Sequence, residues 1–161
     1  MEDYKIENFK RENSKIDFPL HVRVNGIELR SLQDKIFELF YRVFGVRLPE
    51  SMDRFQLIEE EGCKIRADSP NFNLTSVFEY FNLNPAGEIY VNWYRFDKID
   101  RFKLKDLCEY FSYIWYPGSD DIELFCEDIS WMLSISHDGY ISLKFSQVGL
   151  VSPAPLNSRT D

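Results

Sequence analysis

The chain has 161 residues, of which 44% are hydrophobic and 16% aromatic, and its formal net charge is −8 at pH 7. A disordered chain is depleted in aromatic and branched apolar residues, so this composition predicts a folded domain with its own core. No apolar run approaches the roughly 20 residues that span a bilayer, which argues against a membrane protein. The charged start "MEDYKIENFKRENSK" lacks an apolar signal core, so we expect a cytoplasmic location.

Cysteine and histidine usage bounds the chemistry. Cys63, Cys108 and Cys126 are widely spaced and odd in number, which favours reduced thiols over a disulfide framework. With no C-x-x-C pair and only His21 and His137, we expect no closed zinc site. Neither a phosphate-binding glycine loop nor a nucleophile elbow is present. The sequence therefore predicts a protein that is not an enzyme and that needs no cofactor or metal.

The negative charge lies in the second part of the chain. Residues 1–50 balance nine basic against nine acidic residues, whereas residues 51–161 have ten basic and eighteen acidic ones. Between Asp106 and Leu143 there is no Lys or Arg, but there are eight acids: Asp106, Glu109, Asp120, Asp121, Glu123, Glu127, Asp128 and Asp138. Such a field repels nucleic acid and attracts basic surfaces. Charge alone is explained by an acidic surface that serves only solubility, and it also makes a basic protein partner plausible.

Four segments in the first two thirds carry helix or turn signals. "LHVRVNGIELR" alternates around Asn25-Gly26 and predicts a β-hairpin. "SLQDKIFELFYRVFG" predicts a helix capped by Ser31 and ended by Gly45, with apolar residues at helical spacing. "LPESMDRFQLIEEEG" predicts another helix, from Pro49 to Gly62. "NLTSVFEYFNL" predicts a short helix that ends before Pro85.

The later segments predict an α+β fold. "GEIYVNWYRF" alternates as a strand near residues 88–96, and "KLKDLCEYFSYIWY" predicts a helix that Pro117 ends. "DIELF", "SWMLSIS" and "YISLKF" then predict three strands, the last two joined by a tight "HDG" turn. We expect these strands to form an antiparallel β-meander with several helices packed on one face. Residues 1–145 should form one globular domain and residues 146–161 a loosely ordered tail.

The acid pair in "YFSYIWYPGSDDIELF" is the most conspicuous candidate site. Asp120 and Asp121 follow a Pro-Gly turn, and adjacent side chains in a strand would point to opposite faces. The segment lacks an EF-hand pattern, and three roles stay open: turn chemistry, partner contact, and catalysis or metal binding. His137 is explained by the "HDG" turn, and the acids beside Cys126 would raise the pKa of its thiol.

Aromatic residues accompany these acids. Trp and Tyr beside carboxylates form surfaces that receive Lys and Arg, although most such rings fill cores. Tyr116, beside the Pro-Gly turn, is the ring that we most expect at a surface. The predicted partner-binding residues are Tyr116, Asp120, Asp121, Glu123, Glu127 and Asp128.

The stretch "YFSYIWYPGSDDIELFCEDISWMLSISHDGYISL" resembles small bacterial immunity proteins of polymorphic toxins, including those of contact-dependent growth inhibition. It shares with them an aromatic helix, a Tyr-Pro turn, an acid pair, a Trp-containing strand and a His-x-Gly hairpin. The stretch "FGVRLPESMDRFQLIEEEG" is similar to the Leu-Pro-Glu helix entry of the Smi1/Knr4 superfamily, which is rich in immunity proteins. The resemblance implies binding without catalysis: the protein would neutralise the C-terminal domain of a cognate toxin.

The leading hypothesis is thus an immunity protein whose partner is a basic toxin domain, such as a nuclease, with no direct contact to nucleic acid or membrane. The alternative is a non-catalytic adaptor or regulatory domain of a cytoplasmic complex. A third hypothesis is a small hydrolase that uses the carboxylates with a divalent ion.

Overall fold

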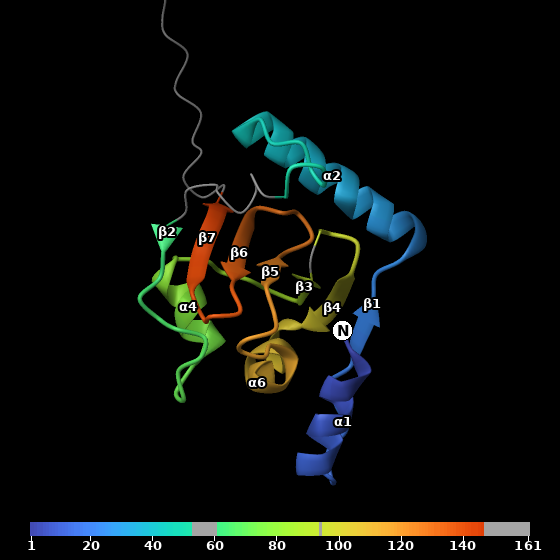
Figure 1. Cartoon of the computed structure of the whole chain (residues 1–161), viewed down its shortest axis with the longest axis vertical. Coiled ribbons are helices and arrows are strands. Elements are labelled where there is room, and N and C mark those ends of the chain that lie inside the picture. The colour runs from blue at the N-terminus through green and yellow to red at the C-terminus, as the bar shows by residue number, and fades with distance from the viewer. Residues whose placement is uncertain (53–60, 94, 147–161) are drawn as a thin grey trace, which may run out of the picture.

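One antiparallel sheet organises the molecule. The structure is a computed structural model and describes residues 1–52, 61–93 and 95–146. Seven strands pair in the order β1-β4-β3-β5-β6-β7-β2 (Figure 1). The strands are β1 His21–Arg23, β2 Glu61–Gly62, β3 Glu88–Asn92, β4 Ile99–Lys103, β5 Ile122–Phe125, β6 Trp131–Ile135 and β7 Ile141–Ser146. The helices are α1 Asp3–Glu12, α2 Gly26–Phe44, α4 Leu74–Tyr80, α5 Leu104–Glu109 and α6 Phe111–Ile114.

The predicted α+β class is confirmed, as is the meander of the C-terminal third. β5, β6 and β7 pair in sequence, and β5 also pairs with β3, the strand predicted near residues 88–96. All four residues of β5 are buried, and so are all of β3 except Glu88. Strands buried on both faces occupy the middle of a sheet, which is where the topology places this pair.

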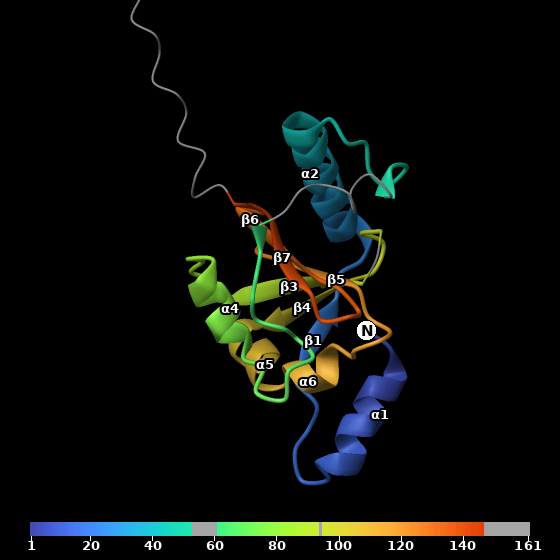
Figure 2. The ribbon, with the colours of Figure 1, turned by 60° about the vertical axis from the view of Figure 1, so that its left-hand side comes forward.

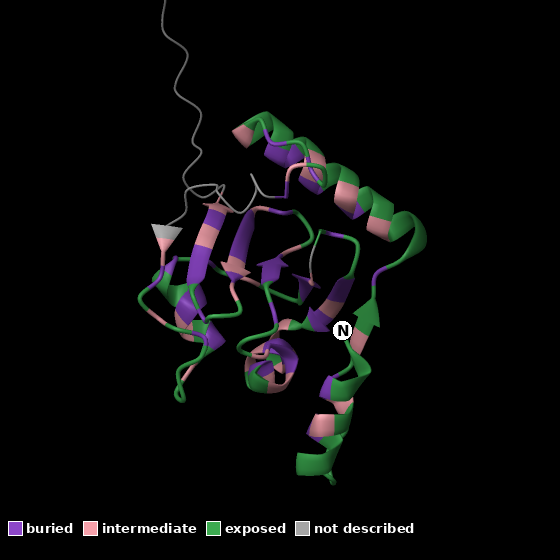
Figure 3. Ribbon diagram, viewed as in Figure 1, coloured by how far each residue is buried: buried purple, intermediate pink, exposed green. Residues whose placement is uncertain are grey.

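Helices cover both faces of the sheet, so the expectation of helices on one face is wrong. Along β3, Ile89 and Val91 pack with α4, α5 and α6, whereas Tyr90 packs with α2. The same alternation separates Leu124 from Phe125 in β5, because successive side chains in a strand point to opposite faces. Figure 2 shows α2 apart from the group of α4, α5 and α6, and Figure 3 shows its buried positions turned toward the sheet.

The hairpin predicted around Asn25-Gly26 is wrong. The segment before it is β1, which pairs with β4 instead of with the residues after the turn. Asn25 is the N-cap of α2, and the helix begins at Gly26, so Ser31 lies inside the helix and caps nothing. Gly45 ends α2 as predicted, in the left-handed conformation at φ 67° that glycine adopts without a steric penalty.

Other predicted boundaries differ in detail. The helix expected from Pro49 to Gly62 falls mostly outside the described residues, and Gly62 lies in β2. The helix before Pro117 is divided at Tyr110 into α5 and α6. Ser146, where the loose tail was expected to begin, is the last residue of β7, and residues 147–161 lie outside the described residues.

Helix α4 begins at a side-chain cap that offers a stability test. Asn73 Oδ1 accepts a hydrogen bond from the backbone N–H of Thr75 at 2.9 Å, which satisfies one of the free donors of the first turn. We expect Asn73→Ala to lower the free energy of unfolding by about 1 kcal/mol, measured by urea denaturation. Asn71→Ala, an exposed change just before the helix, should stay within about 0.5 kcal/mol of the parent. Equal losses in the two variants would argue against the cap.

Candidate functional site

The six residues predicted to bind a partner do not form one surface. Asp121, Glu127 and Asp128 are exposed and Tyr116 is half-buried, but Asp120 and Glu123 are only 8% and 9% exposed. A buried carboxylate offers little charge to an approaching protein, so the expectation of surface acids is wrong for Asp120 and Glu123. Partner binding by the other four stays a prediction.

Asp120 forms a buried ion pair with Lys5 of α1. Lys5 Nζ lies 2.5 Å from Asp120 Oδ2 and also donates to the carbonyl oxygen of Ile114 at 2.8 Å. Asp120 Oδ2 accepts the backbone N–H of Tyr116 at 2.7 Å as well. The Lys5 ammonium lies 4.2 Å from the ring centroid of Trp93, and its burial lowers the pKa of Lys5 despite the nearby carboxylate. Asp120 therefore fixes the turn before β5 onto α1.

Asp100 of β4 gathers a second set of donors in the same region. Arg23 Nε lies 2.7 Å from Asp100 Oδ1, Trp93 Nε1 donates to Oδ2 at 2.6 Å, and the amine of Met1 also pairs with Oδ2. Burial alone would raise the pKa of Asp100, but Arg23 and the amine hold it below its ordinary value. Cations from the first 23 residues thus offset acids that look unbalanced in the sequence.

Asp121 points away from its neighbour and stabilises the β6–β7 hairpin. Its Oδ1 accepts the backbone N–H of His137 at 2.8 Å and lies 2.9 Å from His137 Nδ1. This carboxylate raises the pKa of His137. The "HDG" segment is the predicted turn, with Gly139 at φ 83° and the Asp138 side chain accepting the N–H of Tyr140. Asp121 and His137 are both more than half exposed, and their contact belongs to this turn.

Glu123 belongs to a polar row that crosses the sheet. Register aligns Asn92 of β3 with Glu123 of β5, Glu123 with Ser134 of β6, and Ser134 with Ser142 of β7. Asn92 Nδ2 donates to Glu123 Oε2 at 2.5 Å. Burial raises the pKa of Glu123 to about 7, although the hydrogen bond from Asn92 opposes the shift and Asp121 adds to it. Glu123 therefore gains or loses its proton near neutral pH.

The exposed acids of the β5–β6 connection border a groove of about 720 Å³. We call it the Glu127 groove. Tyr90 and Trp131 lie beneath it with little exposed surface, while Glu88, Glu127 and Asp128 contribute carboxylates. The remaining lining residues are Lys35, Asn84, Pro85, Ala86, Gly87, Cys126 and Ser130. Three carboxylates with one opposing lysine suit a cationic side chain better than an anionic one.

Asp128 also accepts hydrogen bonds from two other residues that line this groove, Cys126 and Ser130. Cys126 Sγ lies 2.8 Å from Asp128 Oδ1, which also accepts the backbone N–H of Ser130 at 3.1 Å. The hydrogen bond from Cys126 lowers the pKa of Asp128, whereas burial and then Asp128 raise the pKa of the Cys126 thiol, the direction that the sequence predicted. Asp128 is thus held as an anion, and Cys126 as a neutral thiol with little nucleophilic character.

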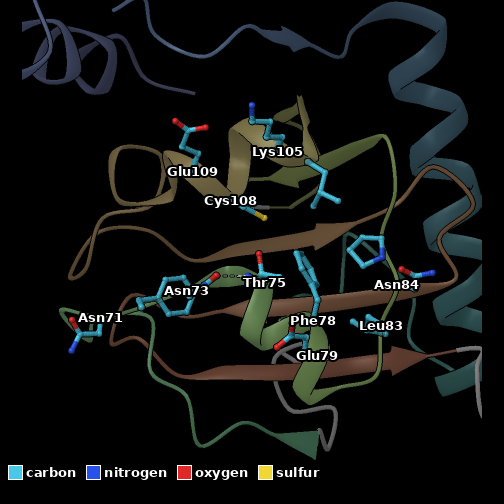
Figure 4. Close-up of a pocket in the computed structure, with 13 residues that line it drawn as sticks. Asn71, Asn73, Thr75, Phe78, Glu79, Leu83, Asn84, Lys105, Cys108 and Glu109 are labelled. Atoms are coloured by element: carbon cyan, nitrogen blue, oxygen red, sulfur yellow. Dashed lines mark hydrogen bonds between the residues drawn. The ribbon is translucent and has the colours of Figure 1, made fainter.

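A second groove, of about 910 Å³, separates α4 from α5 (Figure 4). We call it the α4–α5 groove. Phe78 and Leu83 are buried in its floor, and Phe72, Leu104 and Cys108 are partly buried beside them. Its polar edge carries Asn71, Asn73, Thr75, Glu79, Asn84, Lys105 and Glu109, and Pro85 completes the lining. Asn84 and Pro85 line this groove and the Glu127 groove alike, so the two adjoin.

The described residues contain no group of three or more His, Cys, Asp or Glu side chains placed to hold a metal ion. No helix among them combines the length and the apolar character that crossing a bilayer requires. Comparison with known protein families, curated proteins and solved structures finds no match to this chain. The candidate site therefore rests on the two grooves and the residues that line them.

Sequence reasoning did not find Lys5 and Arg23, the two cationic side chains that pair with the buried Asp120 and Asp100. Both stand in charged segments, where a solvated lysine or arginine is the ordinary expectation. The available signal was Lys5 and Phe9, one helical turn apart, since Phe9 is buried against Phe18, Tyr110 and Tyr113. Because residues four positions apart share one face of a helix, an inward-facing Phe9 would have placed Lys5 on the inner face as well.

Proposed function

We propose that this protein is a bacterial immunity protein. It binds a cognate toxin domain in the cytoplasm and neutralises it by covering the active site or the substrate surface of the toxin. The proposed toxin is a nuclease with a basic cleft, since an acidic partner suits such a cleft electrostatically. The resemblance of residues 110–143 to immunity proteins supports this proposal, and the Glu127 groove is the structural observation that carries it.

The Glu127 groove has the composition of a receptor for Lys and Arg. Glu127 and Asp128 are exposed at its edge, and the pKa of Asp128 is lowered by Cys126, so this carboxylate is charged at neutral pH. Tyr90 and Trp131 line the groove but are only 2% and 4% exposed, so the attraction for a cation comes from the carboxylates. Glu88 is shared with Arg101, whose Nε lies 3.3 Å away, so Glu127 and Asp128 contribute most of the attraction.

We assign no chemistry to the other unusual carboxyl groups. Asp120 is paired with Lys5, and Glu123 is enclosed in the sheet and bonded to Asn92. Asp121 is bonded to the β6–β7 turn. Each has a structural partner that accounts for its position, which supports a protein that acts by binding.

A direct test uses the toxin domain encoded by the gene immediately upstream of this one. The purified domain is titrated with this protein by isothermal calorimetry, and its nuclease activity is followed on plasmid DNA and on transfer RNA. The proposal expects a one-to-one complex and loss of activity at equivalence. No complex, or full activity in the presence of excess protein, would contradict it, and an upstream gene for a metabolic enzyme would favour the adaptor alternative.

Charge reversal at the Glu127 groove tests its role in steering. We expect Glu127→Lys to lower the association rate constant with that toxin domain roughly 3- to 10-fold at low ionic strength, with a smaller effect in about 0.5 M salt. Glu7→Lys, on an exposed position of α1, changes the net charge by the same amount and serves as the matched control. Stopped-flow fluorescence measures both rates. Equal effects of the two variants would mean that the partner approaches another face.

A further inference from the structure

The α4–α5 groove is the second feature that a partner would meet. It has an apolar floor and polar walls, the arrangement found at the energetic centres of protein interfaces. Figure 4 shows Phe78 of α4 and Cys108 of α5 on facing sides, with Glu79 and Glu109 on opposite walls. Its volume of about 910 Å³ lies within the range of about 300–1,000 Å³ typical of binding pockets.

We propose that the toxin domain anchors an apolar side chain in the α4–α5 groove while a basic group of the same surface enters the Glu127 groove. This inference rests on the proposed function and names how the partner is held. The two grooves adjoin at Asn84 and Pro85, so one continuous partner surface reaches both. The partner therefore presents a large apolar residue beside lysine or arginine.

Charge and burial favour a protein segment of this chemistry as the occupant. Glu79 and Glu109 on opposite walls oppose the single cation Lys105, so basic residues that flank an inserted apolar side chain find carboxylates on either side. Beside the buried floor of Phe78 and Leu83, Phe72, Leu104 and Cys108 keep part of their apolar surface in contact with water. An inserted apolar side chain removes that partly exposed surface from water, which is favourable in proportion to the area covered.

The reactivity of Cys108 and Cys126 shows whether a partner covers the two grooves. Cys108 lines the α4–α5 groove and Cys126 lines the Glu127 groove, and both thiols are half-buried. Alkylation by N-ethylmaleimide is followed by mass spectrometry with and without a catalytically inactive form of the upstream toxin domain. We expect the rates at Cys108 and Cys126 to fall at least tenfold in the complex. The added thiol of Lys10→Cys, on an exposed position of α1, should keep its rate within twofold.

A variant that fills the α4–α5 groove shows whether the toxin contacts the groove directly or only stabilises the fold. Thr75 is exposed at the edge of the α4–α5 groove, and we expect Thr75→Trp to weaken toxin binding at least tenfold without lowering the urea midpoint. Lys10→Trp adds the same ring elsewhere and should bind as the parent does. A wild-type complex that leaves Cys108 unprotected and tolerates Thr75→Trp would overturn the anchor but leave the immunity proposal standing. Absence of any wild-type complex would remove both.

Discussion

Replacing Lys5 with methionine is expected to lower the free energy of unfolding by about 3–5 kcal/mol, the cost of leaving a buried charge without its partner. Lys5 is fully buried, and its ammonium supplies Asp120 with a counter-ion 2.5 Å away. Methionine keeps most of the volume of the side chain but leaves the carboxylate without that cation. Because small domains are stable by only about 5–15 kcal/mol, this loss would be a large part of the total. Urea denaturation followed by tryptophan fluorescence measures it.

Two further variants show whether the loss of stability in Lys5→Met comes from the broken ion pair or from the loss of the lysine side chain itself. Lys5→Met combined with Asp120→Asn removes both charges, and we expect it to recover at least half of the loss, since no unpaired ion remains. Lys10→Met changes an exposed lysine of the same helix and should cost less than about 0.5 kcal/mol. A loss below about 1 kcal/mol in Lys5→Met would mean that the pair contributes little.

Glu123 is expected to make the stability depend on pH near neutrality. Its pKa is about 7 in the folded protein against an ordinary value of 4.5, so the folded state holds a proton that the unfolded state has released. Stability from this group is complete below about pH 4.5 and is lost as pH rises through 7. A shift of this size corresponds to about 3 kcal/mol. Glu123→Gln keeps the group neutral at every pH.

We therefore expect Glu123→Gln to be more stable than the parent by up to about 3 kcal/mol at pH 8, and close to the parent at pH 4.5. Urea denaturation at the two pH values measures the difference. The raised pKa of His137 also removes stability as pH rises, but it is common to both proteins and cancels. Glu7→Gln, an exposed control, should show no such dependence. A difference that is independent of pH would show that the pKa of Glu123 is not raised in the folded protein.

The strands of the C-terminal meander were predictable because their burial follows from their own residues. In β5 and β6, apolar residues occupy both faces and turn residues stand between the strands, so local pattern and position in the sheet agree. β4 was not predicted, because Asp100 and Arg101 interrupt its apolar pattern. Their positions are stabilised by Arg23 and Glu28, both remote from them in sequence, and by the indole of Trp93 just after β3.

The candidate site likewise has features that follow from local sequence and features that depend on remote residues. Exposure of Asp121, Glu127 and Asp128 follows from their turns, which the sequence indicates through Pro, Gly and clustered polar residues. The burial of Asp120 depends on a lysine 115 positions away, and that of Glu123 on Asn92 in a neighbouring strand. The number of charges in one segment does not predict these long-range pairings. The α4–α5 groove likewise combines segments 71–85 and 104–109, so it could not be predicted from either segment by itself.

The ion pair between Lys5 and Asp120 also has a consequence for synthesis on the ribosome. The first helix leaves the ribosome long before its partner, since 115 positions separate the two residues. β1 must likewise await β4, about 80 positions later. Contacts of such long range form slowly, because the intervening chain must be ordered first. Until Asp120 has been made, Lys5 lacks its partner, and Phe9 likewise awaits Tyr110 and Tyr113, so an incomplete product would leave both exposed to chaperones and proteases.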